Sequence, residues 1–476
     1  MKDTFMAQIK IVGAGLAGCE AAWQCARRGV PVELYEMRPV RSTPAHKTAD
    51  FGELVCSNSL KSESENTAPW LLKEEMRRCG SLLIDIAQQC AVPAGHALAV
   101  DRAAFAAKVT ETISREPLIK IRREEVTQVG GEHQQFTIVA TGPLTSDALA
   151  SEIARMSATF ESLGQSRVGA PPSPEPFPTG RSEPSGHTLY FYDSISPIVE
   201  ADSIDMSKVY FAARYDKGSA DYINCPMSKE EYHRFYDALT TAESVEAKDW
   251  EKLNYFEGCL PIEEIARRGR DTLRFGPMKP VGLQDPRTGQ RPYAVVQLRQ
   301  ETLRADSYNL VGFQNHLKFA EQASVLRLIP GLENARFLRF GQIHRNTYIN
   351  SPTLLNATLQ MKAHPAILFA GQICGVEGYV ESIATGMLGG MNVAALVSGD
   401  LPIPPPRATA LGSLVHYITH IDPQKFQPAN ITFDLLPPLD RKIRDRQVRH
   451  KRQCELALSE LEAWLGRIGN ERLQRV

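Results

Sequence analysis

The chain has 476 residues, and its 54 lysine and arginine residues almost balance its 55 aspartate and glutamate residues, leaving a net charge of −1. Hydrophobic residues make up 43% and charged residues 23% of the chain, which is typical of a globular protein and not of a disordered or fibrous one. We find no run of about 18 apolar residues, so we expect no membrane-spanning helix and no membrane partner. The near-neutral balance also argues against a protein that attracts nucleic acid by bulk charge.

Nine cysteines are spread along the chain, and no two of them form a C-x-x-C pair. An odd number without close pairs is typical neither of a secreted disulfide framework nor of a zinc site. We therefore predict reduced thiols, no metal site and a cytoplasmic location.

The N-terminal segment has the pattern of a βαβ unit. Residues 8–12 predict a short buried strand, and the G-x-G-x-x-G motif at 13–18 leads into a predicted helix over 19–28. A second strand is predicted over 30–35 and ends at Glu36. A glycine turn between a strand and a helix, with an acid after the next strand, is typical of dinucleotide-binding proteins.

Each position of this turn has a physical role. Gly13 permits the tight turn, Gly15 lets the backbone approach a pyrophosphate, and Gly18 allows the helix to pack closely on the strand. The start of the helix offers free N–H groups and a positive dipole end to phosphates. Glu36 can accept hydrogen bonds from ribose hydroxyls and disfavours a 2′-phosphate. We predict a dinucleotide site that includes Gly13, Ala14, Gly15, Leu16, Ala17, Gly18 and Glu36.

Two later segments resemble parts of a flavin-binding domain. Residues 136–143 predict a strand that ends in a small-residue turn, and 366–372 predict another. The second strand is followed by a glycine-rich turn and a helix predicted over 380–396. This order resembles the FAD-binding domain of the glutathione-reductase superfamily, although periodicity alone does not separate FAD from NAD. The resemblance implies FAD as the cofactor and adds to the site Thr141, Gly142, Gly371, Gln372, Glu377, Gly378 and Tyr379.

The middle of the chain differs from both flanking parts. Residues 171–186 contain six prolines, which predicts a surface loop within 164–186. Beyond it, we expect strands at 189–192, 209–213 and 293–298 and helices at 228–240 and 244–249. The predicted fold is α/β: a Rossmann-like FAD-binding domain at 1–200, an inserted α/β domain at 201–339, and a return to the FAD-binding domain at 340–476.

A strongly basic segment lies near the C-terminus, where a helix is predicted from Leu439 onward. Its cations are Arg441, Lys442, Arg444, Arg446, Arg449, Lys451 and Arg452, with Asp445 as the sole acid. Most such runs are solvated helix faces. Contact with a polyanion is the alternative, because seven cations are more than solvation requires.

Several strings together identify a family. They are LVCSNSLKS at 54–62, DYINCPM at 221–227, RRGRDTLRFGPMKPVGL at 267–283, HRNTYINSP at 344–352, GQICGVEGYVES at 371–382 and GSLVHYIT at 412–419. With the glycine turn, they resemble the folate- and FAD-dependent tRNA (uracil-5-)-methyltransferase family, TrmFO, a distant relative of the GidA-type tRNA modification flavoproteins. The resemblance covers nearly the whole chain apart from the proline-rich stretch, which is longer than the family leads us to expect.

The resemblance implies methylation at C5 of the T-loop uridine in tRNA, which gives ribothymidine. The carbon would come from 5,10-methylenetetrahydrofolate, and the reducing equivalents from NADPH or NADH through FAD. It also implies tRNA as the partner, with no stable protein partner evident, and makes the basic segment at 441–452 the predicted RNA-binding residues.

The same resemblance directs attention to two cysteines. C5 of uracil is a poor nucleophile until a thiolate adds at C6, and cysteine is suited to that addition. We assign Cys225 as the uracil nucleophile and Cys56 as a flavin-side partner or proton-transfer group, and the roles could be reversed. Second-rank candidates are Lys61, Arg274, Lys279, His344 and Arg345.

Two other functions are compatible with a flavin site. One is a flavin oxidoreductase acting on a small molecule, which would have no use for the basic segment. The other is a non-catalytic flavin-binding tRNA chaperone, in which both cysteines would be dispensable.

Overall fold

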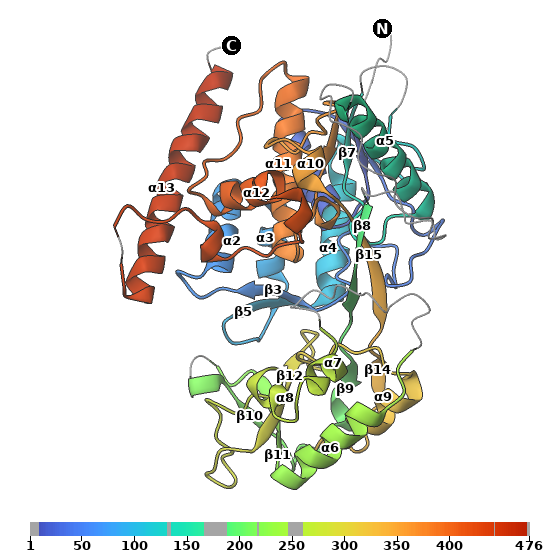
Figure 1. Ribbon diagram of the computed structural model, residues 1–476, viewed down its shortest axis with the longest axis vertical. Helices are drawn as coiled ribbons and strands as arrows, with labels where there is room; N and C mark the ends of the chain where they lie inside the picture. The colour runs from blue at the N-terminus through green and yellow to red at the C-terminus, as the bar shows by residue number, and fades with distance from the viewer. Residues whose placement is uncertain are drawn as a thin grey trace, which may run out of the picture.

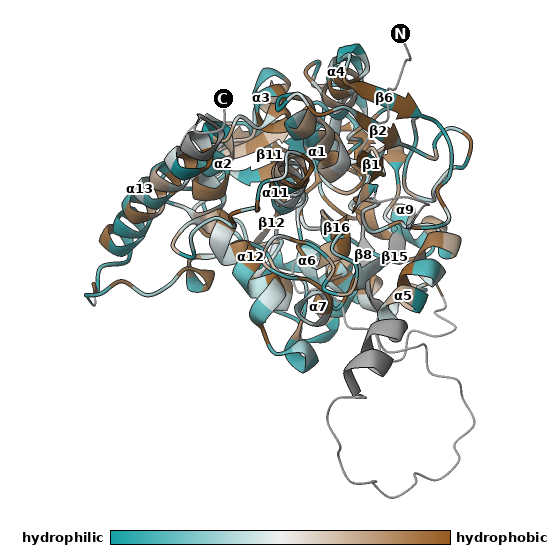
Figure 2. Ribbon diagram, turned by 90° about the horizontal axis from the view of Figure 1, so that it is seen from above, coloured by the Kyte–Doolittle hydropathy of each residue, from teal (hydrophilic) through white to brown (hydrophobic). Residues whose placement is uncertain are grey.

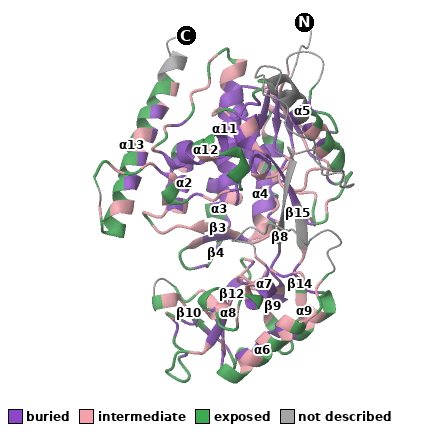
Figure 3. Ribbon diagram, in the orientation of Figure 1, coloured by how far each residue is buried: buried purple, intermediate pink, exposed green. Residues whose placement is uncertain are grey.

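The computed structural model describes residues 9–130, 135–165, 188–216, 219–245, 260–441 and 443–473, with side chains described except at 158–165, 188–194, 216, 343–345 and 470–473. The proline-rich residues 171–186, most of the helix predicted over 244–249, and Lys442 lie outside these ranges. The described residues form two large hydrophobic cores, one around a parallel sheet and one around an antiparallel sheet, and a small third cluster of Val92, Ala94 and Ala99. Figure 3 shows the buried residues gathered in an upper and a lower part.

The upper part is built on a five-stranded parallel sheet (Figure 1). Its strand order is β16 (Ile367–Phe369), β7 (Phe136–Val139), β1 (Ile9–Val12), β2 (Val32–Tyr35) and β6 (Ile119–Arg122). The register pairs Ile9 with Val32 on one side and with Phe136 on the other. The strands predicted over 8–12, 30–35, 136–143 and 366–372 are all present, so the predicted α/β fold class is confirmed.

Helices surround this sheet. They are α1 (Leu16–Ala26), α2 (Ala68–Arg78), α3 (Leu82–Gln89), α4 (Arg102–Arg115), α5 (Asp147–Gln165), α10 (Ser351–Leu354), α11 (Tyr379–Val397), α12 (Ala410–His420) and α13 (Arg446–Leu473). A small antiparallel sheet of β3 (Ser59–Ser62), β5 (Ala97–Val100) and β4 (Ala91–Val92) lies at the lower edge of this unit (Figure 1).

Helices α1 and α11 pack together through small residues. A Cβ on Gly386 would lie 2.3 Å from the carbonyl oxygen of Ala17, and one on Gly390 would lie 2.4 Å from that of Ala21. Real Cβ atoms do not approach so closely, so glycine is what lets the two backbones meet. Because α1 and α11 both begin beside the glycine-rich turns, this contact fixes the two halves of the predicted cofactor site against each other.

Helix α11 is also the described helix that is long and apolar enough to cross a membrane by length and composition. The expectation that the chain has no membrane-spanning helix stays a prediction. However, 83% of its apolar window is buried inside the protein, where it packs against α1, β7 and β16. Its apolar composition thus matches its position in the core.

The lower part is a six-stranded antiparallel sheet with helices on it. The strand order is β10 (Tyr210–Ala212), β11 (Tyr222–Met227), β12 (Ala294–Gln300), β13 (Ser307–Leu310), β9 (Ile198–Glu200) and β14 (Phe337–Arg339). The helices are α6 (Lys229–Thr241), α7 (Ile262–Arg267), α8 (Thr272–Phe275) and α9 (Phe319–Leu326). Ser228 and Glu231 form a capping box that starts α6. The predicted domain boundaries, 1–200, 201–339 and 340–476, stay a prediction.

Two long strands join the units. Strands β8 (Thr188–Ser194) and β15 (Ile343–Ile349) pair antiparallel and run between the upper and lower parts in Figure 1. The chain therefore leaves the parallel-sheet unit and returns to it along one two-stranded connection.

Candidate functional site

The glycine turn between β1 and α1 faces a cleft. Gly13 has a φ of +100°, and a Cβ there would lie 2.6 Å from the carbonyl oxygen of Ala140. A Cβ on Gly18 would lie 1.7 Å from the carbonyl oxygen of Gly13. By contrast, a Cβ on Gly15 would meet no atom within 4 Å, so its backbone is open to a close-lying ligand.

The cleft above this turn contains about 990 Å³ of empty space. Ten of the predicted cofactor-binding residues line it: Gly13, Gly15, Leu16, Ala17, Glu36, Thr141, Gly142, Gly371, Gln372 and Tyr379. Most of them directly follow the carboxyl ends of β1, β2, β7 and β16, where open parallel sheets bind nucleotides, and the others begin α1 and α11. Because α1 and α11 both begin at this cleft, their first N–H groups favour an anionic ligand.

Four predicted cofactor-binding residues do not line the cleft. Ala14 donates its peptide N–H to Glu36 Oε2 at 3.1 Å, and Gly18 is buried beneath the turn. Glu377 accepts a hydrogen bond of 2.8 Å from Asn430, while Gly378 lies against the ammonium group of a lysine. Glu377 and Gly378 thus belong to a polar cluster beside the cleft.

Glu36 ends β2 as predicted, and its carboxylate is fixed from several sides. Its Oε1 accepts the peptide N–H of Arg38 at 3.0 Å and the Arg38 Nε–H at 2.9 Å. Burial raises the pKa of this carboxyl, but the hydrogen bonds and charge of Arg38, together with the N–H of Ala14, outweigh it and lower the pKa below its ordinary value. Ionised Glu36 still has an acceptor position on Oε2 for a ribose hydroxyl.

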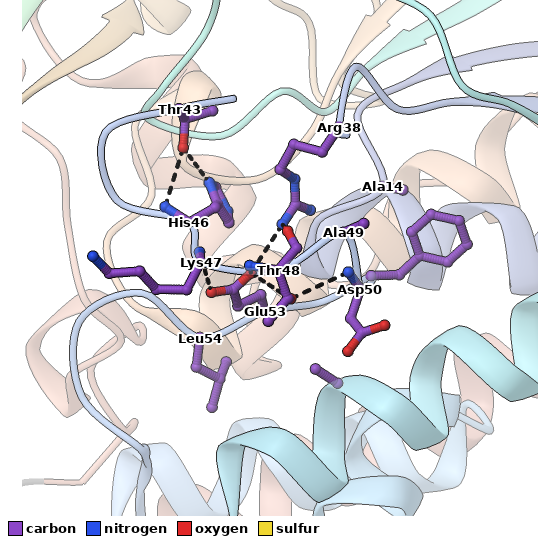
Figure 4. Close-up of polar contacts among 12 residues, drawn as sticks. Ala14, Arg38, Thr43, His46, Lys47, Thr48, Ala49, Asp50, Glu53 and Leu54 are labelled. Atoms are coloured by element: carbon purple, nitrogen blue, oxygen red, sulfur yellow. Dashed lines mark hydrogen bonds and ion pairs between the residues drawn. The ribbon is translucent and has the colours of Figure 1, made fainter. Parts of the chain in front are cut away.

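The loop after β2 is organised by a residue pair that the sequence reasoning missed. Arg38 Nη1 donates to Glu53 Oε2 at 3.0 Å, and Glu53 also accepts the peptide N–H groups of Lys47 at 2.7 Å and Thr48 at 3.1 Å (Figure 4). Figure 4 shows the loop folded around the Glu53 carboxylate. Only one feature of the sequence pointed to this pair, namely that Arg38 is a cation two positions after Glu36. This pair anchors the segment that leads to Cys56.

Cys56 lies at the edge of the cleft. Its peptide N–H donates to Tyr379 Oη at 2.7 Å, and Tyr379 itself lines the cleft. The carbonyl oxygen of Cys56 accepts Arg102 Nη2–H at 2.9 Å. The cysteine is partly exposed, whereas the other cysteines whose burial is described are buried.

Three arginines interact with the Cys56 thiol. Arg102, Arg299 and Arg339 each interact electrostatically with it. Arg102 belongs to α4 of the parallel-sheet unit, and Arg299 and Arg339 belong to strands of the six-stranded sheet. Nearby guanidinium groups favour the thiolate form, which is the nucleophilic form of cysteine.

The two units meet at this cysteine. Asn58 donates to the carbonyl oxygen of Gln300 at 2.9 Å and accepts Arg299 Nε–H at 2.9 Å. Arg102 forms a bidentate ion pair with Glu301: its Nε–H donates to Oε2 at 2.6 Å and its Nη2–H donates to Oε1 at 3.1 Å. The segment that carries Cys56 is therefore held against the six-stranded sheet by buried polar contacts.

Cys225 has a different environment from the one its predicted role requires. It lies on β11 with 0% exposure, on the side of the sheet that packs into the second hydrophobic core. Burial raises the pKa of its thiol far above the ordinary value, because there is no solvent to stabilise a thiolate. In this conformation Cys225 is an apolar core residue, and its assignment as the uracil nucleophile stays a prediction.

Lys61, a second-rank candidate, belongs to a buried polar cluster beside the start of α11. Its ammonium group pairs with Glu381 at 2.6 Å and also contacts Asn430. Its backbone adopts a φ of +63°, and buried Lys73 donates to its carbonyl oxygen at 3.2 Å. Glu381 is fully buried. The cluster ties the Cys56 segment to the helix that closes the cleft.

The other second-rank candidates lie elsewhere. Arg274 stacks on the ring of Tyr293 at 3.6 Å and pairs with Asp271 at 2.7 Å. Lys279 is exposed on the six-stranded unit. The side chains of His344 and Arg345 on β15 lie outside the described part of the chain.

The basic segment is only partly helical. Helix α13 begins at Arg446, so the helix predicted from Leu439 starts seven residues too early. Asp445 explains the later start, because its carboxylate accepts the peptide N–H of Val448 at 2.9 Å and caps the helix. Arg441, Arg444, Arg446, Lys451 and Arg452 are exposed, and Arg449 is half-buried. Figure 2 shows hydrophilic and apolar residues alternating along α13.

Comparison with known proteins agrees with this geometry. A parallel sheet with a glycine turn, a terminal acid and a late helix over the cleft defines a dinucleotide-binding protein of the flavoprotein type. The family model described as Glucose inhibited division protein A matches residues 8–400. The structure of GidA from Aquifex aeolicus superposes with a TM-score of 0.65 at 15% identity, covering 96% of this chain and 73% of that chain, which shows a shared fold.

Closer relatives carry a more specific name. The protein named methylenetetrahydrofolate–tRNA-(uracil-5-)-methyltransferase TrmFO from Koribacter versatilis is 69% identical, covering 96% of this chain and 98% of its own length. Those of the same name from Solibacter usitatus and Anoxybacillus flavithermus are 59% and 52% identical, covering 96% and 97% of this chain and 98% and 100% of their own lengths. The chain belongs to the TrmFO family, within the wider group of Glucose inhibited division protein A. The resemblance found in the sequence motifs is confirmed.

Proposed function

We propose that this protein methylates C5 of the T-loop uridine in tRNA, with 5,10-methylenetetrahydrofolate as the carbon donor and FAD as the bound cofactor. One observation carries the proposal: Tyr379 lines the dinucleotide cleft and at the same time accepts the peptide N–H of Cys56. The backbone of a partly exposed cysteine is thereby fixed beside a flavin-type cleft. We place the reaction in the cytoplasm, in keeping with the reduced cysteines.

The cleft fits FAD. Its open Gly15 backbone and the start of α1 suit a pyrophosphate, and ionised Glu36 suits the ribose next to it. The start of α11 and the turn at Gly371 would lie along the flavin end of the cofactor. Bound FAD supplies the electrons that convert the transferred one-carbon unit into a methyl group, with NADPH or NADH as the external reductant.

Cys56 is the better placed of the two cysteines to act at this cleft. In the reaction we propose, its thiolate adds to C6 of uracil, and the electron pair of the C5–C6 double bond makes C5 the nucleophile. C5 then bonds to the methylene carbon of the donor, the bond between that carbon and the donor nitrogen breaks so that tetrahydrofolate leaves, and a hydride equivalent from bound FAD would complete the methyl group. Loss of the C5 proton and elimination of the thiolate restore the double bond and release the enzyme. Arg102, Arg299 and Arg339 support the first step by favouring the thiolate.

The tRNA would be held by the exposed cations between Arg441 and Arg452. Phosphate contacts of this kind position a nucleic acid without reading its sequence. The segment lies outside the cleft, so its role is to hold the tRNA while the uridine enters the site.

The test uses the FAD-loaded protein with methylenetetrahydrofolate, NADPH and an unmodified tRNA transcript. We expect 5-methyluridine in the digested tRNA by mass spectrometry. The absence of 5-methyluridine would contradict the proposed activity. If the protein instead couples NADPH oxidation to reduction of a small molecule without tRNA, the reading as a small-molecule flavin oxidoreductase is favoured. If Cys56→Ala and Cys225→Ala both keep full activity, the thiol mechanism is wrong. Cys90→Ala, at a buried cysteine that does not line the dinucleotide cleft, is the matched control.

A further inference from the structure

A hollow on the six-stranded unit has no lining residue in common with the dinucleotide cleft. It contains about 1590 Å³ of empty space beside β10, which forms one edge of the six-stranded sheet while β14 forms the other (Figure 1). Phe211 of β10 and Tyr215 in the turn after it line the hollow, together with Gly282 and Arg291 from the chain that precedes β12. The reaction proposed above uses none of these residues.

Two aromatic rings are exposed in this hollow. Phe211 is 48% exposed and Tyr215 is 56% exposed, although both are large and apolar. The other lining residues from this part of the chain are small: Ala212, Ala213 and Ala220. Their size leaves room beside the rings for a flat ligand. Two large exposed rings in one hollow favour a binding surface over an ordinary stretch of surface.

The ring of Tyr215 is held in place by an unusual backbone. Tyr215 has a φ of +60° and a ψ of 24°, in the left-handed region that tyrosine rarely adopts. Its peptide N–H donates to the carbonyl oxygen of Gly282 at 2.7 Å, and Arg214 donates to that of Val281 at 2.9 Å. A Cβ on Gly282 would lie 2.8 Å from the tyrosine ring, so glycine is what lets the ring lie against this backbone. Backbone strain of this kind is retained where a side chain must be oriented for binding.

The charge around the hollow favours an anionic ligand. Arg291 is exposed, and it is the one charged residue among the described residues that line the hollow. The segment 274–284, which leads into the lining at Gly282, contains Arg274 and Lys279 and no acid. Lys279 is exposed. Phosphates of a ligand would therefore meet positive charge beside the rings, without an opposing carboxylate from the described lining.

We propose that this hollow binds an unpaired nucleobase of the tRNA substrate, which stacks on the rings of Tyr215 and Phe211 while Arg291 contacts a neighbouring phosphate. The ligand class is a single-stranded nucleotide within an RNA. This inference rests on the proposed function, because it takes tRNA as the substrate. It adds to the basic segment a second tRNA contact, made by stacking and not by charge alone.

An RNA base fits these features better than a free nicotinamide cofactor does. Proteins bind unpaired RNA bases by stacking them on aromatic rings and by placing cations along the phosphates. A nicotinamide cofactor must place its reactive ring against the flavin, whereas the hollow and the dinucleotide cleft share no lining residue. A folded tRNA is large enough to enter the active site with one nucleotide and to reach the hollow with another.

Filter binding of an unmodified tRNA transcript to the FAD-loaded enzyme, across a salt series, tests the proposal. Tyr215→Asn removes the ring and keeps the backbone, because asparagine tolerates the left-handed region. We expect its tRNA affinity to fall by roughly 5- to 100-fold, as for the loss of stacking with one base. The slope of log K against log salt should not change, because stacking releases no counterions. Arg291→Gln should instead reduce that slope by about 0.7–0.9.

Two further variants serve as controls. Tyr215→Phe keeps the ring and should bind tRNA within about twofold of the wild type. Phe275→Asn makes a matched change at a ring that is 82% exposed on the same unit but does not line the hollow, and it should leave tRNA affinity unchanged. Tyr215→Asn should unfold at no lower temperature than the wild type, because asparagine relieves the left-handed strain. Should it fail to fold, Phe211→Leu tests the other ring.

Photocrosslinking tests the contact without any substitution. Ultraviolet irradiation of the complex between wild-type enzyme and tRNA joins stacked bases to aromatic side chains. We expect peptide mass spectrometry to find a nucleotide attached to Tyr215 or Phe211. Reduction of FAD by NADPH in the absence of tRNA should proceed at the wild-type rate in Tyr215→Asn.

Three outcomes overturn the inference: unchanged tRNA affinity in Tyr215→Asn, an equal loss in Phe275→Asn, or crosslinks that form elsewhere and at neither ring. If tRNA affinity is unchanged and reduction by NADPH slows, the hollow is a nicotinamide-cofactor site. Wild-type turnover separates these failures from failure of the proposed function. If the wild type makes 5-methyluridine while Tyr215→Asn binds tRNA normally, only the inference about the hollow falls. If tRNA binding depends on Tyr215 but no 5-methyluridine forms, the proposed reaction falls and the base site stands.

Discussion

The hydroxyl oxygen of Tyr379 accepts a hydrogen bond of 2.7 Å from the peptide N–H of Cys56, a residue 323 positions away in the chain. Tyr379 is the first residue of α11, whose start lines the dinucleotide cleft. Cys56 belongs to the segment that leads to β3 and to the contact with the six-stranded unit. This one bond therefore links the cofactor site, the reactive thiol and the boundary between the units.

Removing the Tyr379 hydroxyl tests this link. In Tyr379→Phe the Cys56 N–H loses its acceptor, and a lost partner for a buried donor costs about 1–3 kcal/mol. If the loss of this hydrogen bond displaces Cys56 during turnover, the same free energy is added to the activation barrier. We then expect kcat to fall by roughly 5- to 100-fold, with FAD content unchanged. Steady-state kinetics and flavin absorbance of the purified variant measure both quantities. Equal kcat for variant and wild type would show that the bond does not position the thiol.

The contrast between the two cysteines predicts different reactivity towards an alkylating agent. Cys56 is partly exposed among arginines, whereas Cys225 is fully buried in an apolar core with a raised pKa. Iodoacetamide should modify Cys56 in the native protein and Cys225 only in denaturant. Peptide mass spectrometry of timed samples measures the order. Early labelling of Cys225 would mean that the six-stranded unit opens readily, and would support the predicted role of Cys225 as the uracil nucleophile.

The helix contact beneath the cleft predicts a matched pair of glycine variants. Gly386→Ala places a Cβ where the carbonyl oxygen of Ala17 is 2.3 Å away, so α1 and α11 must separate. Such overpacking lowers the free energy of unfolding by roughly 1–3 kcal/mol, and FAD should bind more weakly. Gly389→Ala, whose Cβ meets Ala370 Cβ at an ordinary 3.5 Å, is the control and should be neutral or stabilising. Thermal unfolding of both variants, with and without FAD, distinguishes them.

The comparison of sequence and structure shows which features local spacing can predict. The turn at 13–18 and Glu36 were found because a strand, a turn and a helix lie within one short βαβ unit. The bond between Cys56 and Tyr379 could not be found, because no spacing rule relates residues so far apart. The burial of Cys225 could not be predicted for a related reason: a motif shows which residue recurs in a family, but only packing shows whether its thiol meets solvent.

The start of α13 was predicted wrongly for a different reason. Asp445 was read only as the single acid in a basic run, although aspartate before a helix is a common N-cap. The carboxylate of Asp445 accepts the N–H of Val448, and the peptide N–H of Arg449 bonds to the carbonyl oxygen of Asp445 at 3.0 Å. The signal was present in the sequence and was outweighed by the charge pattern around it.

Two histidines with lowered pKa values should make the free energy of unfolding depend on pH. Burial, with the charges of Arg407 and His420, lowers the pKa of His416, and burial, with Arg446 and Arg449, lowers the pKa of His450. Below about pH 6.5 the unfolded chain binds protons at these sites that the folded protein does not yet bind. The free energy of unfolding should therefore fall as the pH is lowered below 6.5.

Variants isolate the contribution of each ring. His416 is stacked on His420 at 4.5 Å and His450 on Phe433 at 4.0 Å. The double variant His416→Gln, His450→Gln should show a flatter decline between pH 6.5 and 5.5 in urea unfolding. His364→Gln, an exposed histidine outside both stacks, should keep the wild-type slope. An unchanged slope in the double variant would assign the pH dependence to other groups.

The basic segment predicts a salt-dependent contribution to tRNA binding. Replacing Arg446, Lys451 and Arg452 with glutamine removes three exposed cations at the start of α13. Each phosphate contact contributes about 0.7–0.9 to the slope of log K against log salt, so three lost contacts should reduce the slope by about two to three. Filter binding across a salt series measures it. Arg467→Gln, exposed nearer the other end of α13, is the control and should leave the slope unchanged. If the triple variant binds tRNA with wild-type affinity and slope, the segment is a solvated helix face and the tRNA is held elsewhere.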